Sequence, residues 1–335
     1  MFSPQIAVND AISPPFAAIG DRKLGVFVSL DGVQTLVTGV SGSVGSALVP
    51  RLRRDGHAVR GFARSRERVT RAGVELDDLV LGDATTGQGL KAALKDVEVA
   101  YYLIHSMEGP ATGAFVDLER RQAAAFAAAA RAANVRRIVY LGGLLPQHAA
   151  PSRHLASRLA VERALLAAAP EPVALRASIV IAASSRSFRF LVRLIERLPV
   201  LALPAWRANR TQPIDGRDVL EFLAAAATLP TLHTGRAWDI GGPDVMTYQQ
   251  LLDRIATVLM IDRPAISLPF NLTPVASVIA AAVAEEDPGL IEPLMESLEH
   301  DLLPRDRDAA TVFGVKLHTF QAAVERAVRD MEGAP

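Results

Sequence analysis

Three glycines in the segment TLVTGVSGSVGSALVPRL have the spacing and surroundings of a phosphate-binding turn. Gly39 permits a tight turn, Gly42 lets the backbone approach a pyrophosphate, and Gly45 lets the following helix pack closely on the preceding strand. The free N–H groups and the positive dipole of the helix amino end would then face the phosphates. The pattern therefore predicts a dinucleotide site. The contacts expected at this turn are Gly39, Ser41, Gly42, Ser43, Val44 and Gly45.

The segment HAVRGFARSRERV bears on which nicotinamide dinucleotide would bind. A site that prefers NAD(H) usually ends this strand with a carboxylate that accepts from the ribose 2′-hydroxyl, whereas arginine meets the 2′-phosphate of NADP(H). Arg64, Ser65 and Arg66 occupy the turn, and the first acid is Glu67. The turn therefore favours NADP(H), with Arg64 as the main contact and NAD(H) as the alternative. Solvated charges at a helix start would also explain these residues.

Further strand ends supply residues that would lie beside the dinucleotide. Asp83 ends the strand DLVLGD, where its carboxylate can accept from the adenine amino group or cap a turn. His105 ends the strand VAYYLIH, where it can bind cofactor or substrate or simply cap the strand. The contacts expected at these ends and at the end of RRIVYLG are Asp83, Ala84, Leu103, Ile104, His105, Leu141 and Gly142.

The alternation of β-branched runs with 3.6-periodic runs from Val33 onward predicts an α/β fold, because βα units build a parallel sheet covered on both faces. Strands are expected near 33–39, 57–63, 78–83, 99–105, 136–142 and 173–181, and helices at 43–55, 87–95, 113–133 and 154–168. This is a Rossmann-type, doubly wound parallel sheet, which binds ligands at the carboxyl ends of its strands. The dipeptide Asp31-Gly32 also allows an added edge strand at 24–30.

The pattern changes after about residue 180, where prolines become frequent and helices dominate over short strands such as AWDIGG. We expect a flexible extension at residues 1–30, a Rossmann domain at 31–180, and a smaller, mostly helical, discontinuous substrate lobe at 181–335 packed on that domain. The stretch LTPVASVIAAAVA, at 272–284, is too short for the roughly 20 residues of a membrane helix and is expected to be a core or interface helix.

The composition narrows the classes of function. Lys plus Arg and Asp plus Glu each total 36, so no net charge favours nucleic acid or an anionic membrane. The chain has no cysteine, and its seven histidines are not spaced as metal ligands, so no disulfide, thiolate nucleophile or metal site is expected. With neither a secretory signal nor a membrane helix evident, we expect a cytoplasmic protein, alone, in a homo-oligomer or with a protein partner.

Several of these segments together resemble the extended short-chain dehydrogenase/reductases: TGxxGxxG, the Asp83-Ala84 pair, RRIVYLGG and VALRASIVI. Others are similar to the atypical NAD(P)H-binding branch, which includes NmrA-like regulators and the 39-kDa accessory subunit of respiratory complex I. They are YYLIHSM, IVYLGGL, SRHLASRLAVERAL, NRTQPI and WDIGGPDVMTYQQLL. The resemblance runs from about residue 33 to the end and is more specific in the amino half.

For typical members the resemblance implies a catalytic tyrosine, a lysine four positions later that holds the ribose, and an upstream serine that binds the substrate oxygen. The matching positions hold His154, Arg158 and Gly142-Gly143, so all three depart from the pattern. Arg158 can still reach a ribose hydroxyl, but arginine stays protonated and cannot serve as a proton donor. His154 could exchange protons near neutrality. A plain helix start, with Ser152 as its N-cap, is the alternative.

Substrate contacts follow mainly from the same resemblance. In extended members the segment matching RANRTQPIDGRDV closes over the substrate, so Arg210 and Gln212 are expected to line the pocket, with an ion-paired loop as the alternative. Ser178 follows the sixth strand, where the substrate lobe begins. The backbone N–H groups near Gly143 could replace the missing serine as donors to an oxyanion.

Two functions fit these residues. The first is an NADP(H)-dependent oxidoreductase that acts on a small carbonyl or quinone-like substrate, with His154 and Arg158 as its catalytic residues. The second is a non-catalytic NAD(P)(H)-binding regulatory or assembly protein, which the missing tyrosine, lysine and serine would suit.

Overall fold

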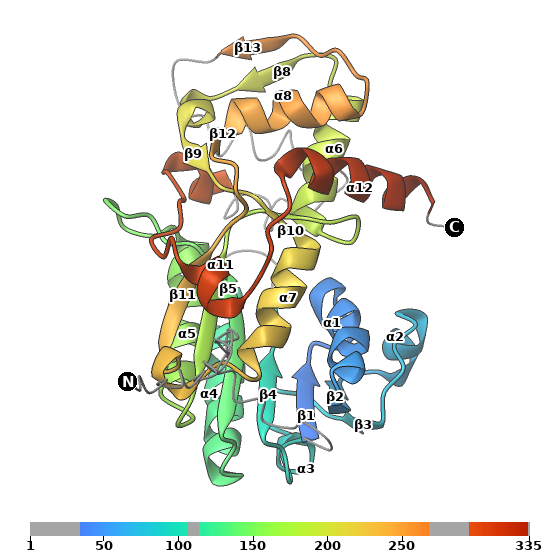
Figure 1. The fold of residues 1–335 in the computed structure, drawn as a ribbon, viewed down its shortest axis with the longest axis vertical. Coiled ribbons are helices and arrows are strands. Elements are labelled where there is room, and N and C mark those ends of the chain that lie inside the picture. The colour runs from blue at the N-terminus through green and yellow to red at the C-terminus, as the bar shows by residue number, and fades with distance from the viewer. Residues whose placement is uncertain (1–33, 106–113, 268–294, 334–335) are drawn as a thin grey trace, which may run out of the picture.

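The computed structural model describes residues 34–105, 114–267 and 295–333. Its centre is a seven-stranded parallel sheet in the order β11-β6-β5-β4-β1-β2-β3 (Figure 1). The strands are β1 (Gln34–Thr38), β2 (Ala58–Ala63), β3 (Asp78–Leu81), β4 (Val99–Tyr102), β5 (Arg137–Gly143), β6 (Val173–Ala177) and β11 (Arg236–Ile240). The expected doubly wound sheet is confirmed, and its strand order reverses between β1 and β4.

Both faces of the sheet are buried, because successive strand residues point to opposite sides. Leu36 and Tyr102 join a core with α4 (Ala114–Ala132) and α5 (Arg153–Leu166), whereas Val37 and Tyr101 join a core with α1 (Ser43–Arg54) and α7 (Gly216–Ala226). Two short helices, α2 (Arg66–Arg71) and α3 (Leu90–Ala93), lie near the β3 edge (Figure 1).

Two predicted elements differ in length. The helix expected at 87–95 shrinks to α3, because Gly87 and Gly89 adopt positive φ values of 79° and 80° and delay its start. The strand expected at 173–181 is split: β6 ends at Ala177, and β7 (Val180–Ile181) pairs instead with β10 (Ile214–Asp215). The expected strand at 24–30 and the apolar stretch at 272–284 lie outside the described residues.

A second lobe stands beyond the carboxyl ends of the strands (Figure 1). It has its own core, in which Phe188, Leu251 and Phe320 are buried together. Its elements are α6 (Arg186–Arg197), β8 (Leu201–Leu203), η1 (Ala205–Ala208), β9 (Arg210–Thr211), β12 (Met246–Thr247), α8 (Tyr248–Val258), β13 (Ala265–Ser267), η3 (Ser297–Glu299) and α12 (Phe320–Glu332). This lobe covers the carboxyl ends of the sheet strands, where ligands are expected.

Part of the chain after residue 180 belongs to the sheet layer and not to the lobe. The segment AWDIGG, expected among the lobe strands, contributes to β11, which pairs in parallel with β6 in the register Trp238↔Leu175. Trp238 is 3% exposed and packs against Phe313 of α11 (Ala309–Phe313), with ring centroids 5.6 Å apart. The chain crosses back because Trp238 and Ile240 need the main core to bury their apolar area.

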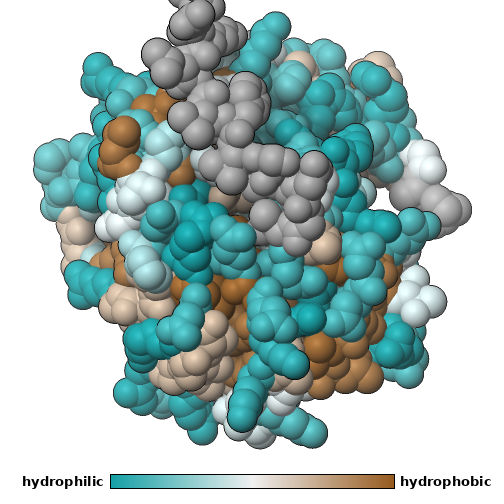
Figure 2. Space-filling view, turned by 60° about the horizontal axis from the view of Figure 1, so that its bottom comes forward, coloured by the Kyte–Doolittle hydropathy of each residue, from teal (hydrophilic) through white to brown (hydrophobic). Residues whose placement is uncertain are grey.

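The surface carries no membrane-spanning element within the described ranges, since no helix there is both long and apolar enough to cross a bilayer. Figure 2 brings the bottom of the molecule forward and shows hydrophilic residues interspersed with hydrophobic ones. Leu232, in the short η2 helix (Thr231–His233), is one of the exposed apolar side chains, at 78%. Single exposed leucines of this kind are normal on soluble domains.

The placement of β11 can be tested by Trp238→Ala. Removing a large side chain from the core should lower the free energy of unfolding by about 3–5 kcal/mol, measured by urea denaturation. The control Leu232→Ala, at an exposed position, should change it by less than about 0.5 kcal/mol. Similarly small changes in the free energy of unfolding for both variants would contradict the burial of the Trp238 side chain against α11.

Candidate active site

A cavity of about 1090 Å³ lies at the carboxyl ends of the strands, between the sheet and the second lobe. Its wall combines the turn after β1, the ends of β2, β4 and β5, and residues of α5, α6, α7 and α12. The predicted site residues that line it are Gly39, Ser41, Gly42, Ser43, Val44, Gly45, Arg64, Asp83, Ala84, Leu103, Ile104, His105, Leu141, Gly142, Gly143, His154, Arg158 and Ser178.

The glycine turn has no room for side chains. Gly39 has φ +65°, and a Cβ there would lie 2.5 Å from the carbonyl oxygen of Leu103. A Cβ on Gly45 would lie 2.4 Å from the carbonyl oxygen of Gly39. Gly42 precedes α1 and offers no side chain to cap its N–H groups. The turn therefore leaves the helix amino end free for an anionic group, and these residues fit a dinucleotide pyrophosphate.

Thr38, which the sequence did not single out, fixes the geometry beside this turn. It is fully buried; its Oγ1 donates to the carbonyl oxygen of Tyr101 at 3.0 Å and accepts from the backbone N–H of Leu103 at 3.1 Å. The hydroxyl thereby joins the carboxyl ends of β1 and β4, the point where the strand order reverses. Dinucleotides bind at such switch points.

The end of the cavity near β2 is basic. Arg64 is exposed and lines the wall together with Arg68 and Arg71 of α2. Ser65 caps α2: its hydroxyl accepts from the backbone N–H of Arg68 and donates to the Glu67 carboxylate at 2.6 Å. Arg68 and Arg71 were missed, although their spacing of four and seven from Arg64 would place all three on one side of a short helix.

Asp83 lies at the next strand end and acts first as a turn cap. Its Oδ1 accepts from the backbone N–H of Thr85 at 2.7 Å, which is the structural alternative that the sequence left open. The residue still lines the cavity, as does Ala84. A contact of Asp83 with an adenine amino group stays a prediction.

Arg158 has a buried carboxylate partner on α4. The residue is 4% exposed, and its Nη2 donates to Oε1 of Glu119 at 2.9 Å. Glu119 is 2% exposed, and its Oε2 accepts from the Ser157 hydroxyl at 2.6 Å. Arg158 lines the cavity, and its second terminal nitrogen, Nη1, is buried and has no hydrogen-bond partner among the described residues. Glu119 was not found from the sequence, because it lies 39 positions away.

His154 is also unsatisfied at the cavity. Ser152 caps α5, as the alternative interpretation expected, by accepting from the backbone N–H of Leu155. The Nδ1 atom of His154 is buried without a partner in the described part of the chain. Burial, and then the charge of Arg158, lower the pKa of His154 to about 3. The ring is therefore neutral at pH 7, which corrects the expectation that it exchanges protons near neutrality.

His105 opens onto the same cavity. Desolvation of the His105 ring lowers its pKa well below the usual value, and the nearby Arg158 and His154 lower it further. Both cavity histidines are therefore neutral hydrogen-bonding groups at pH 7.

Packing explains why Gly142 and Gly143 carry no side chain. A Cβ on Gly142 would lie 2.9 Å from the Tyr140 ring, and one on Gly143 would lie 2.9 Å from Cδ2 of Leu155. Tyr140 in turn donates from its hydroxyl to the carbonyl oxygen of Arg158 at 3.4 Å. A serine at either position would thus displace groups that seat α5 on the sheet.

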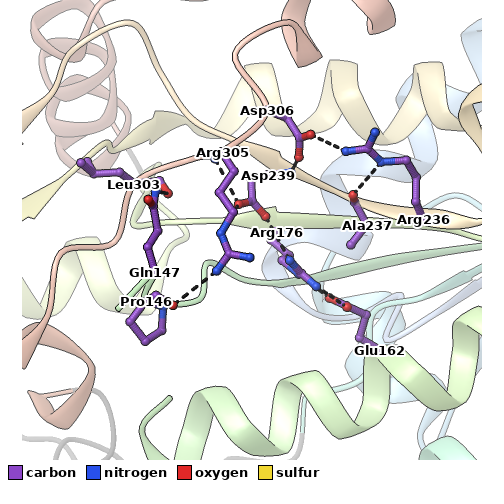
Figure 3. A network of polar contacts seen from close by, with 10 residues as sticks. All are labelled: Pro146, Gln147, Glu162, Arg176, Arg236, Ala237, Asp239, Leu303, Arg305 and Asp306. Atoms are coloured by element: carbon purple, nitrogen blue, oxygen red, sulfur yellow. Dashed lines mark hydrogen bonds and ion pairs between the residues drawn. The ribbon is translucent and has the colours of Figure 1, made fainter. Parts of the chain in front are cut away.

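An ion-pair network holds α5 and the loop after β5 in place (Figure 3). Arg176 on β6 donates to both carboxylate oxygens of Glu162 at 2.7 Å, one helical turn beyond Arg158, and to Asp239 at 3.4 Å. Arg305 reaches the same Asp239 through its backbone N–H and donates to the carbonyl oxygen of Pro146. Arg176 therefore anchors the end of β6 to α5 and β11.

Two predicted substrate residues do not line the cavity. Arg210 pairs with Asp301, with Nη2 2.6 Å from Oδ2, and Gln212 donates to the carbonyl oxygen of Gly242 at 2.6 Å. The ion-paired loop is therefore what the structure contains. Ser178 does line the cavity, and its hydroxyl lies 2.6 Å from that of Thr211.

The far wall of the cavity comes from Asp215, in the segment expected to close over the substrate, and from α12, which carries no sequence signal of a site. Asp215 caps α7 and binds Arg217 at 2.6 Å, and Arg326 of α12 lies 3.8 Å from the same carboxylate. Arg326 is more than 100 residues from Asp215 along the chain, so only the tertiary fold brings the two together.

Comparison with known proteins agrees with this geometry. Residues 39–178 match the family described as NAD(P)H-binding. The chain is 26% identical over 259 residues to the Arabidopsis thaliana NADH dehydrogenase [ubiquinone] 1 alpha subcomplex subunit 9, mitochondrial; the match covers 76% of this chain and 64% of that one. The chain thus spans less than two thirds of the plant subunit. It is 28% identical to the Caulobacter vibrioides ceramide reductase, over 70% of this chain and 73% of the reductase.

Among solved structures, the Citrobacter sp. triphenylmethane reductase complexed with NADP(H) has a similar fold, with a TM-score of 0.65 at 18% identity. The superposition covers 88% of this chain and 99% of the reductase. Residues 39–178 therefore match an NAD(P)H-binding family, and the likeness to this reductase shows a shared fold.

Proposed function

We propose that this protein is an NADP(H)-dependent oxidoreductase that reduces a small carbonyl or quinone-like compound. The observation that carries the proposal is one continuous cavity that contains the glycine turn, the basic end near β2, and the unpartnered Nη1 of Arg158. Two curated relatives are named as a dehydrogenase subunit and a reductase, which supports the same reaction class.

The residues that would hold the cofactor follow the cavity wall. The turn at Gly39–Gly45 would bind the pyrophosphate, Arg64 the 2′-phosphate, and Arg158 the nicotinamide ribose. When bound, the reduced cofactor supplies a hydride. The protein's own contribution is to orient the two reactants and to exclude water from the space beneath the second lobe.

The NADP(H) preference can be tested by Arg64→Ala. Loss of a charge-assisted contact with the 2′-phosphate should raise the Kd for NADPH about 10–100-fold and leave the Kd for NADH nearly unchanged, measured by fluorescence titration. Arg66→Ala, on the same turn but outside the cavity lining, is the matched control. Equal affinities of the wild type for NADPH and NADH would contradict the preference.

Arg158 is the group best suited to assist hydride transfer. Its Nη1 can donate to a substrate oxygen as negative charge develops there, which stabilises the transition state electrostatically. Arginine cannot release the proton that the product needs. The neutral His154 ring can orient the oxygen by a hydrogen bond, and the proton is then taken from solvent.

The neutral state of the buried His154 ring can be tested through the pH dependence of the free energy of unfolding. Its folded-state pKa of about 3 lies below the unfolded value, so the unfolded chain binds more protons between these two values and stability falls as pH falls. His154 should contribute about 2 kcal/mol to the loss of stability between pH 7 and pH 5, and His154→Gln should remove that share. Urea unfolding at both pH values measures the difference. Parallel pH curves for wild type and variant would show that the ring is not buried as a neutral group.

The reaction itself can be tested by NADPH oxidation at 340 nm with a panel of aldehydes, ketones, enones and quinones. Wild type should turn over at least one class, and Arg158→Met should lower kcat/KM about 100-fold. Gly45→Ala is the control for cofactor loss, because the added Cβ collides with the carbonyl oxygen of Gly39. NADPH binding by the wild type without oxidation across the panel would contradict the proposed reaction.

A second candidate is a non-catalytic NAD(P)(H)-binding assembly protein. The packing at Gly142 and Gly143 favours it, since those positions cannot take the usual serine without moving Tyr140 or Leu155. The similarity to a plant complex I subunit also supports it. Tight cofactor binding without turnover, together with a protein partner recovered from the native cell, is the outcome it requires.

A further inference from the structure

We infer that Glu119 on α4 is a positioning residue that balances the charge of Arg158 and thereby sets how strongly the protein prefers the reduced over the oxidised cofactor. The inference rests on the proposed binding of NADP(H). It concerns a carboxylate that lies behind the cavity wall and contacts Arg158 instead of the cofactor.

Hydrogen bonds hold the Glu119 carboxylate in place. Both of its carboxylate oxygens accept hydrogen bonds, one from Arg158 Nη2 at 2.9 Å and one from the Ser157 hydroxyl at 2.6 Å. The Glu119 and Arg158 side chains are only 3% and 5% exposed, so solvent screens their charges little. Because Glu119 holds Nη2, the unpartnered Nη1 remains at the cavity.

The position of Arg158 places it at the nicotinamide half of the cavity. The basic end with Arg64 lies at β2 and the glycine turn lies after β1, whereas Arg158 lies beside the end of β5, on the other side of β1 and β4. A dinucleotide that spans a switch point puts its two nucleosides on opposite sides of the pyrophosphate. With the 2′-phosphate near Arg64, the nicotinamide is therefore on the side of Arg158.

The two redox forms of the cofactor differ in charge at this end. The oxidised nicotinamide ring carries a formal positive charge and the reduced ring is neutral, while the phosphates are the same. A lone buried Arg158 would repel the oxidised ring, and the nearby neutral histidines would not offset it. The Glu119 carboxylate cancels that repulsion, because it lies one hydrogen bond away from the guanidinium.

The experiment compares the Kd of NADP⁺ with the Kd of NADPH in one buffer, by calorimetry. Glu119→Gln keeps the side-chain shape but removes the charge, and it should raise the ratio Kd(NADP⁺)/Kd(NADPH) about tenfold. Arg158→Gln should lower the ratio, since the guanidinium charge that offsets the carboxylate is then removed. The double variant Glu119→Gln/Arg158→Gln should return the ratio to within about threefold of wild type, because neither charge remains.

Two controls separate charge from shape. Asp117→Asn removes an exposed carboxylate from the same helix, 63% exposed and paired with Arg120, and should leave the ratio unchanged. Glu119→Asp keeps the charge, so it should keep the ratio even where both dissociation constants rise.

The outcomes also separate this inference from the proposed function. If the wild type binds neither cofactor form, the proposed function is wrong. If it binds both, and Glu119→Gln changes the two constants by the same factor, Glu119 is only structural and the inference is overturned. Thermal unfolding shows whether Glu119→Gln folds. If it does not, Arg158→Gln is compared with the double variant. Equal values of Kd(NADP⁺)/Kd(NADPH) in those two variants would overturn the inference.

Discussion

The close approach of β1 and β4 at their carboxyl ends is the constraint on which the site depends. The buried Thr38 hydroxyl bridges the two strands, and Gly39 passes within a distance of Leu103 that no Cβ would allow. This contact creates the crevice at the switch point and aims the amino end of α1 into it. Every other site residue is placed relative to this turn by the parallel register of the sheet.

Charge burial shapes the opposite end of the cavity. Arg158 and Glu119 are both almost fully buried, and a pair of this kind is tolerated only when hydrogen bonds satisfy its members. One guanidinium nitrogen, Nη1, is buried without a partner among the described residues, on a side chain that lines the cavity. Burial, and then the same permanent charge, lower the pKa of His154 and keep its ring neutral at pH 7.

The chain passes between the sheet layer and the second lobe more than once. α7, β11 and α11 return to the sheet layer after the first lobe segments, and α12 then goes back to the cavity wall. Arg305, Asp239, Arg176 and Glu162 connect these returning segments to α5 through ion pairs, as Figure 3 shows. The position of α5 therefore depends on residues from both halves of the sequence.

The local pattern of the sequence determined the Rossmann-type sheet, the glycine turn and the cavity position of Arg64, because strand periodicity and glycine spacing act over short distances. The cavity positions of His154 and Arg158 followed from the family resemblance. The local pattern could not place Glu119 against Arg158, Trp238 in the main core, or Arg210 on Asp301, since each of these pairings joins residues far apart in the chain. Nor could it show that His154 is neutral. Burial decides that property, and burial exists only once the tertiary structure has formed.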